Sequence, residues 1–246
     1  MNFYPTDLLS CVHPEWYPLV TESLNDVDSA YLLQLQDTPE CLPNIGKMLS
    51  AFSVPLSTTQ YLLFGESPYP RKISANGYAF WDAAVGCLWS TRGFSREINR
   101  ATSLRNLMKM LLYARGDLVD DFSQNAIARL DNSIYYQTAQ ELFNHVMQQG
   151  FLLLNASLVY QPKKIPYHAK MWRPFVSALL NKLFEEKPTI QLLLFGKIAE
   201  LVPNHQRFSC LIAEHPYNLS FITNPQVINF FKPLDILYHH ERKFFN

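Results

Sequence analysis

Four short apolar segments, each ending in or followed directly by glycine or a polar residue, constrain the fold of this chain more than any other feature. They occupy residues 61–65, 151–155, 191–196 and 209–213. Each has the length of a buried strand, and segments with helical periodicity separate them. Uniformly apolar strands that alternate with helices are typical of a parallel sheet covered on both faces. We therefore predict a three-layer α/β/α fold with a central four-stranded parallel sheet.

The position of the first apolar segment predicts the domain organisation. We expect residues 1–58 to form a helical N-terminal part and residues 59–240 to form the core that carries the functional residues. Apolar side chains at helical spacing follow Pro43, a residue type favoured in the first turn of a helix. With 246 residues, 48% of them hydrophobic, the chain can bury one substantial core. We predict a single domain over residues 1–246.

The middle of the chain carries two further helical patterns. A helix is predicted from residue 99 to 112, with Thr102 or Ser103 as its cap. A second helix is predicted to end before Gly150, because glycine commonly follows the last turn of a helix. The polar segment 116–133 between them is predicted to be a loop.

Charge and cysteine usage narrow the class of protein. The formal net charge is zero, which argues against a surface coated in basic charge but leaves room for a local phosphate-binding patch. The four cysteines lie far apart, at positions 11, 41, 87 and 210, and form no C-x-x-C pair. This pattern favours reduced thiols and no structural zinc. With no signal peptide and no apolar run of membrane-spanning length, we expect a cytoplasmic protein.

Polar residues follow the predicted strands at the points where they end. Glu66 and Ser67 come directly after the first strand, Asn155 closes the second, Lys197 follows the third and His215 the fourth. In open α/β sheets, ligands bind beyond the carboxyl ends of the strands. These residues therefore predict a binding crevice, although the stretch around Glu66 alone is equally consistent with a strand followed by a proline turn.

Seven short motifs follow one another along the chain: GESPYP at 65–70, NGYAF at 76–80, SLRN at 103–106, LLLN at 152–155, His168 with Trp172, LLFGK at 193–197 and HPYNLS at 215–220. In the same order they resemble the motifs G-Q-D-P-Y-H, H-G-L-A-F, S-L-x-N, L-L-L-N, S-H-x-x-x-G-W (one residue fewer here), L-L-W-G-x and H-P-S-P-L-S. These are motifs of the uracil-DNA glycosylase superfamily, and specifically of its family 1 branch. The matches span roughly residues 60–240. The resemblance implies the glycosylase fold.

The resemblance also implies roles for individual residues. Phe80 matches the phenylalanine that stacks on uracil, and Asn155 matches the asparagine that reads the edge of the base. Tyr69 matches the tyrosine that closes the pocket against the 5-methyl group of thymine. His215 matches the histidine that donates to the uracil O2 as negative charge develops on the leaving base. The alternative interpretations are a core phenylalanine, a strand-ending asparagine and a loop histidine.

Contacts to DNA are expected from residues that match the family's phosphate-binding and wedge positions and from nearby cations. Leu219 matches the leucine that fills the stack vacated by a flipped nucleotide. The residues predicted to contact DNA are Leu219, Ser220, Ser103, Lys197, His168, Arg71 and Lys72.

Departures from the family pattern bear on activity. Ser67 stands where the family has its catalytic aspartate, and Glu66 stands where it has glutamine. The iron–sulfur branch of the superfamily, with G-E-A-P-G, also lacks the aspartate and is active, but the cysteine spacing here implies no cluster. Pro70 replaces a histidine, and Tyr217 and Asn218 replace the Ser and Pro of the phosphate clamp.

The resemblance implies DNA base recognition and excision, in which the N-glycosidic bond of a flipped uracil is hydrolysed with impaired or altered activity. The candidate catalytic residues are His215, Ser67 and Glu66. One alternative is an inactive glycosylase-fold protein that serves as a DNA- or protein-binding accessory module. Another is an active glycosylase for a different modified pyrimidine. We expect a monomer that binds uracil-containing DNA, needs no metal or cofactor, and has no membrane partner.

Overall fold

The computed structural model describes residues 6–239, and the chain within it divides into two compact units. The first, here called the sheet unit, comprises Met1–Phe80 and Gly150–Ile212. The second, the helical unit, comprises Trp81–Gln149 and Ala213–Asn246. Each unit is therefore built from two stretches of sequence, and the single-domain organisation stays a prediction.

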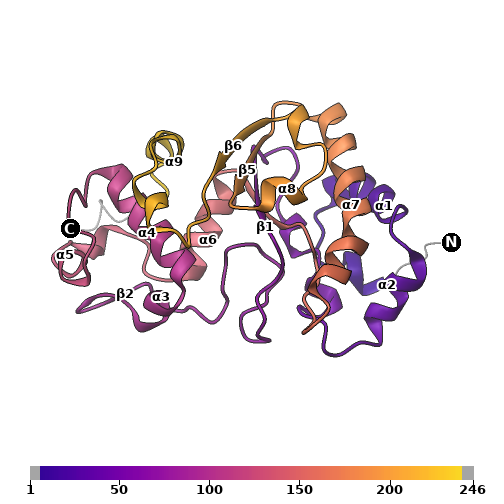
Figure 1. Ribbon diagram of the computed structural model, residues 1–246, viewed down its shortest axis with the longest axis horizontal. Helices are drawn as coiled ribbons and strands as arrows, with labels where there is room; N and C mark the ends of the chain where they lie inside the picture. The colour runs from indigo at the N-terminus through magenta and orange to yellow at the C-terminus, as the bar shows by residue number, and fades with distance from the viewer. Residues whose placement is uncertain (1–5, 240–246) are drawn as a thin grey trace. The chain divides into compact units, whose positions relative to one another are not determined.

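The sheet unit is built on a four-stranded parallel sheet. Its strands are β1 (Tyr61–Gly65), β4 (Phe151–Asn155), β5 (Gln191–Phe195) and β6 (Ser209–Ala213), arranged in the order β4-β1-β5-β6. Figure 1 labels β1, β5 and β6 of this sheet. Tyr61 pairs with Phe151 on one side and with Gln191 on the other, and Gly65 pairs with Asn155. The side chains of β4 are buried along its whole length, as expected for a strand covered on both faces. The predicted α/β class and four-stranded parallel sheet are confirmed.

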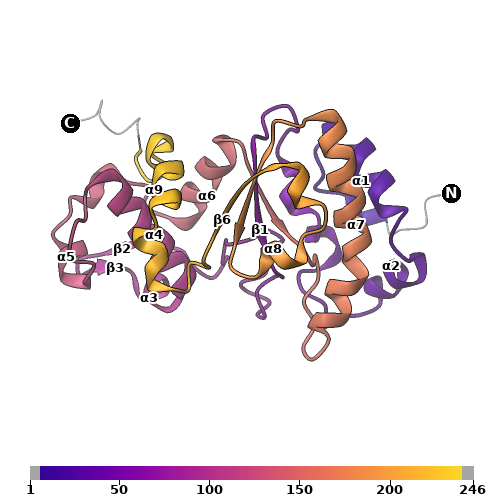
Figure 2. The same ribbon diagram turned by 45° about the horizontal axis from the view of Figure 1, so that its top comes forward.

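Helices flank this sheet and bury its apolar side chains. They are α1 (Tyr17–Leu24), α2 (Ser29–Gln36), α7 (Ile165–Glu186) and α8 (Ile198–Leu201), with 3-10 turns at η1 (Thr6–Leu9), η2 (Pro14–Trp16), η3 (Ile45–Lys47), η4 (Ser50–Ser53) and η6 (His205–Arg207). Figure 2 shows α1 lying along α7, where Lys182 forms an ion pair with Glu22. Trp16 and Phe52 pack edge to face, with ring centroids 5.1 Å apart, and anchor the N-terminal part in the core. The helical pattern expected after Pro43 is realised as short 3-10 turns.

The helical unit carries a two-stranded hairpin and the remaining helices. Its elements are β2 (Trp89–Ser90), β3 (Gly93–Phe94), α3 (Arg96–Arg100), α4 (Thr102–Arg115), α5 (Gln124–Ala128), η5 (Asn132–Ile134), α6 (Ala139–Gln148), η7 (Leu219–Thr223), α9 (Pro225–Phe231) and η8 (Lys232–Leu234). The predicted helix that ends before Gly150 is confirmed as α6. It starts with a capping box, in which Thr138 and Glu141 satisfy each other's backbone N–H groups.

Two predictions about this unit were wrong. Neither Thr102 nor Ser103 caps α4, because Ala101 occupies the cap position without a side-chain bond. The preceding helix α3, capped by Ser95, ends where the chain turns at Ala101. The predicted loop 116–133 contains α5, whose first turn is stabilised by the hydroxyl of Ser123. In both places a serine caps a short helix, α3 or α5, that the spacing of apolar residues does not predict.

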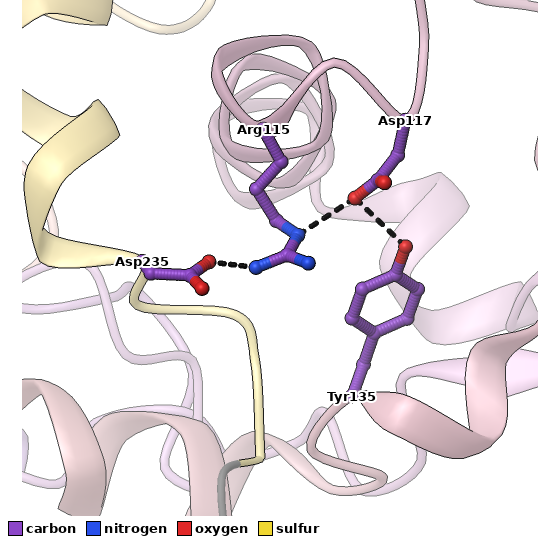
Figure 3. Close-up of polar contacts among 4 residues, drawn as sticks. All are labelled: Arg115, Asp117, Tyr135 and Asp235. Carbon is purple, nitrogen blue, oxygen red and sulfur yellow. Dashed lines mark hydrogen bonds and ion pairs between the residues drawn. The ribbon is translucent and has the colours of Figure 1, made fainter.

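A cluster of charged side chains lies at the C-terminal end of α4 (Figure 3). Arg115 Nε donates to Asp117 Oδ2 over 2.7 Å, and the same guanidinium pairs with Asp235. The hydroxyl of Tyr135 donates to Asp117 Oδ2 over 2.9 Å, and Arg115 also lies over the ring of Tyr238, 4.8 Å from its centroid. Burial opposes ionisation of Arg115, but the bonds to the two carboxylates prevail and raise its pKa. The cluster therefore ties α4 to two segments distant in sequence.

Candidate functional site

The carboxyl ends of β1 and β4 bring the side chain of Asn155 against the backbone of Gly65. Asn155 is only 2% exposed. A Cβ atom at Gly65 would lie 2.4 Å from Asn155 Oδ1 and 2.9 Å from the Cβ of Ala79. Because no side chain fits in that space, glycine is required here by close approach. The ends of two strands and residue 79 therefore meet at one point.

The backbone of Phe80 adopts an unusual conformation beside this point. Its φ of 63° lies in the left-handed region, which bulky residues rarely adopt. The preceding residue, Ala79, donates its N–H to the carbonyl of Leu153 over 3.0 Å, and the hydroxyl of Tyr69 donates to the Phe80 carbonyl over 3.2 Å. Strain of this kind persists where the surroundings over-determine the conformation. These bonds fix the backbone on both sides of Phe80, and its half-buried ring meets the ring of Phe195 edge to face, with centroids 6.4 Å apart.

Together, Tyr69, Phe80 and Asn155 can recognise a flat polar ring. An aromatic ring offers a stacking face, and an amide offers two donors and an acceptor for hydrogen bonds to the edge of a base. The structure brings these three predicted residues together in the sheet unit. Their individual roles stay predictions.

Glu66 and Ser67 follow β1 and line one pocket. The loop backbone is fixed to the chain after β4, since Ala156 N–H donates to the Gly65 carbonyl over 2.8 Å and Ser157 N–H to the Glu66 carbonyl over 3.0 Å. Adjacent residues that leave a strand ordinarily point to opposite sides. Here both border a cavity of about 410 Å³, where Glu66 is exposed and Ser67 half-buried.

Helices α7 and α8 supply the opposite wall of this cavity. The wall is largely apolar, with Ile165, Ala169, Val176 and Leu201 among its residues. Two cations, Lys170 and Arg173, stand one turn apart on α7 and also line the cavity. The sequence analysis missed both of them, because nothing in the helical pattern indicates that these positions face the loop after β1.

The helical unit carries His215 on a loop that hydrogen bonds hold in place. The backbone N–H of Tyr217 donates to His215 Nδ1 over 3.1 Å, which places the proton of the neutral imidazole on Nε2. Asn106, fully buried on α4, donates through Nδ2 to the Pro216 carbonyl over 2.7 Å. The sequence analysis missed this function of Asn106, although the residue closes the S-L-x-N motif.

The residues predicted to contact DNA fall in both units. Arg71, Lys72 and Lys197 are exposed in the sheet unit; Leu219 and Ser220 are exposed and Ser103 is half-buried in the helical unit. The prediction that all of them, together with His215, line one crevice stays a prediction.

His168 lies in the interior of the sheet unit. It is 2% exposed, and its Nδ1 lies 2.8 Å from the hydroxyl of Tyr31 on α2. Its Nε2 lies 3.1 Å from Gln161 Oε1. Burial, aided by the charge of Lys164, lowers the pKa of His168 below its usual value. With both ring nitrogens engaged, this arrangement argues against the predicted contact with DNA.

Within residues 6–239, no group of three or more His, Cys, Asp or Glu side chains could hold a metal ion. All four cysteines are free thiols. No helix in the same range is both long and apolar enough to cross a membrane.

The fold and the gathered residues define a glycosylase-like α/β protein, and comparison with known proteins identifies its family. A crystal structure of wild-type UNG from Nitratifractor salsuginis is 39% identical, covers 94% of both chains and superposes with a TM-score of 0.89. The uracil-DNA glycosylase of Corynebacterium glutamicum is 26% identical over 222 residues, which is 85% of this chain and 81% of that protein. The enzyme of the same name from Chromobacterium violaceum is 26% identical over 228 residues, or 88% and 83% of the two chains.

Two other comparisons complete the assignment. No family model matches the chain. Mimivirus uracil-DNA glycosylase, at 16% identity and a TM-score of 0.54, covers 87% of this chain and 72% of its own and shares the fold. On the strength of the relative at 39% identity, the chain belongs to the uracil-DNA glycosylase family.

Proposed function

We propose that this protein recognises uracil in DNA and excises it by hydrolysing the bond between the base and its sugar. The observation that carries the proposal is the gathering of Tyr69, Phe80 and Asn155 at the carboxyl ends of β1 and β4, in a chain that belongs to the uracil-DNA glycosylase family. A base must leave the duplex before an enzyme can reach its glycosidic bond, so such a site needs a stacking ring and an edge-reading group.

In this proposal Phe80 stacks on the flipped base and Asn155 hydrogen-bonds its Watson–Crick edge. Tyr69 occupies the space that the 5-methyl group of thymine would need. Because Asn155 is buried, a base that leaves its amide unpaired is penalised by the cost of an unsatisfied buried polar group.

The proposed chemistry is divided among His215, Ser67 and Glu66. Nε2–H of His215 donates to the base as negative charge develops on it, consistent with the bond that Nδ1 accepts from Tyr217. Ser67 holds a water molecule but does not ionise near neutral pH. Loss of a charged transition-state stabiliser costs on the order of 3–5 kcal/mol. We therefore propose an activity well below that of an enzyme with the aspartate.

Glu66 supplies the carboxylate that remains. It borders the same cavity as Ser67, and its backbone is fixed by Ser157. A carboxylate at this position stabilises a positively charged sugar in the transition state. Arg71, Lys72, Lys197, Ser103 and Ser220 are proposed to bind phosphates, and Leu219 to fill the stack that the base vacates.

Excision from a uracil-containing oligonucleotide tests the proposal. We expect slow release of uracil by the wild type, a gain of about a hundredfold or more for Ser67→Asp, and a further loss for Glu66→Gln. The same oligonucleotide with thymine is the substrate control, and Glu200→Gln, a change of an exposed carboxylate on α8, is the protein control. Equal rates for the wild type and Ser67→Asp would show that another group already does this work.

A second candidate function is an accessory module that binds DNA or protein without cleaving. The presence of Ser67 in place of a carboxylate favours it. Tight, uracil-selective binding with no release of uracil, restored to excision by Ser67→Asp, would select this alternative.

A further inference from the structure

Two large apolar side chains stand in solvent on the loop after His215. Tyr217 is 68% exposed and Leu219 is 71% exposed. They belong to an exposed run, residues 217–220, that lies between the buried residues Pro216 and Phe221. Large apolar side chains that stand close together in solvent can mark an interaction site.

The backbone that carries these side chains is fixed. Tyr217 N–H is bound to His215 Nδ1, Asn218 N–H donates to the His215 carbonyl over 2.9 Å, and Asn106 holds the Pro216 carbonyl. Phe221 and Ile222 anchor the following turn η7 in the core of the helical unit. The two side chains are therefore presented by a preorganised loop, which reduces the entropy that binding must overcome.

Tyr217 and Leu219 flank a single residue of the loop. Tyr217 lies in the turn that the bond from Asn218 N–H to the His215 carbonyl closes, and Leu219 is the first residue of η7. Asn218, between them, is extended, with φ −80° and ψ 140°. Both exposed side chains therefore belong to the short segment where the turn passes into η7.

We propose that Tyr217 stacks on a base near the flipped nucleotide, so that Tyr217 and Leu219 act together as a double wedge. This inference rests on the proposed function, and it assigns to Tyr217 a contact with substrate DNA that lies outside the base pocket. Tyrosine suits the position, because its ring stacks on any base and its hydroxyl stays hydrated. The contact stabilises the opened duplex and is independent of the chemical step.

Binding to a duplex that resists cleavage tests the contact without reference to excision. The duplex carries 2′-fluoro-deoxyuridine, with the fluorescent base 2-aminopurine placed one or two steps away. We expect wild-type binding to change the fluorescence, Tyr217→Ala to weaken binding about tenfold and remove part of the change, and Tyr217→Phe to retain both. Tyr17→Ala, which truncates an exposed tyrosine of the sheet unit, is the matched control and should bind like the wild type.

Each outcome decides between specific alternatives. Wild-type affinity and fluorescence in Tyr217→Ala would overturn the wedge while leaving the proposed function intact. Absence of any uracil-selective binding by the wild type would instead overturn the proposed function, and the wedge with it. If Tyr217→Ala alters only the sedimentation coefficient, the loop contacts a second copy of the chain and the DNA contact is wrong. An unchanged melting temperature of Tyr217→Ala would separate a lost contact from a damaged fold.

Discussion

The residues proposed to read the base and those proposed to open the duplex are held in opposite ways. Around Gly65 and Asn155, close packing leaves no room for one added carbon, and the strained backbone of Phe80 is fixed by bonds on both sides. On the loop that carries Tyr217, hydrogen bonds fix the backbone but leave the side chains in water. A pocket that selects one nucleobase needs a rigid shape. A side chain that inserts between bases needs only a fixed backbone and an exposed end.

The comparison predicts where substitutions damage the fold and where they damage only function. In the pocket, a change of side chain alters stability and selectivity together. At the exposed tip of the loop, truncation removes a contact with the ligand and leaves the protein folded.

Gly65→Ala should have the largest effect on stability. Its new Cβ would force apart Asn155 and Ala79, and overpacking of this kind costs about 3 kcal/mol. Urea unfolding should show the loss, and excision assays should show weaker discrimination of uracil from thymine. Gly86→Ala is the matched control, because a Cβ there meets no atom within 4 Å. If Gly65→Ala is as stable and as selective as the wild type, the pocket accommodates the added Cβ. The pocket would then be no more rigid than the loop that carries Tyr217.

Asn106→Ala should act on the loop through its anchor. The change leaves the Pro216 carbonyl without its 2.7 Å bond inside the protein, at a cost of about 2 kcal/mol. Excision should fall as well, because His215 and Tyr217 lose their fixed backbone. Chemical denaturation and steady-state kinetics measure the two effects. Should excision survive intact, the loop would be held mainly by the packing of Phe221.

The buried imidazole of His168 should make the stability of the protein sensitive to acid. Burial lowers the pKa of His168 in the folded protein, while the unfolded chain takes up its proton near pH 6.5. Below that pH the unfolded state binds more protons than the folded state. The free energy of unfolding therefore falls as the pH drops from about 6.5 towards the lowered pKa of His168. The loss amounts to about 1.4 kcal/mol for each unit by which the pKa is lowered.

His168→Gln should flatten the acid side of the stability profile, because an uncharged amide replaces the buried ring between Tyr31 and Gln161. Thermal unfolding between about pH 5 and 7 measures the slope. His215→Gln, at a half-buried loop position, should lower excision. A slope that persists in His168→Gln would assign the acid sensitivity to other groups.

The four strands of the sheet and the resemblance to the glycosylase family could both be predicted from the residues alone. Each strand is a short apolar run that ends at a local signal, such as the Gly65–Pro70 stretch or the amide of Asn155. Information of this kind lies within a few neighbouring residues, so periodicity and composition suffice to find it. For the same reason the motifs could be matched in order along the chain.

Contacts between side chains that are distant in the sequence could not be predicted in this way. The sequence placed His168 among the DNA contacts, but the hydroxyl of Tyr31, 137 residues away along the chain, holds it in the interior. Asn106 similarly reaches Pro216 across 110 residues. Glu66 and Ser67 share a cavity with residues of helix α7, which lies about a hundred positions further along the chain. Such contacts depend on the packing of distant segments, and no local pattern of residues encodes them.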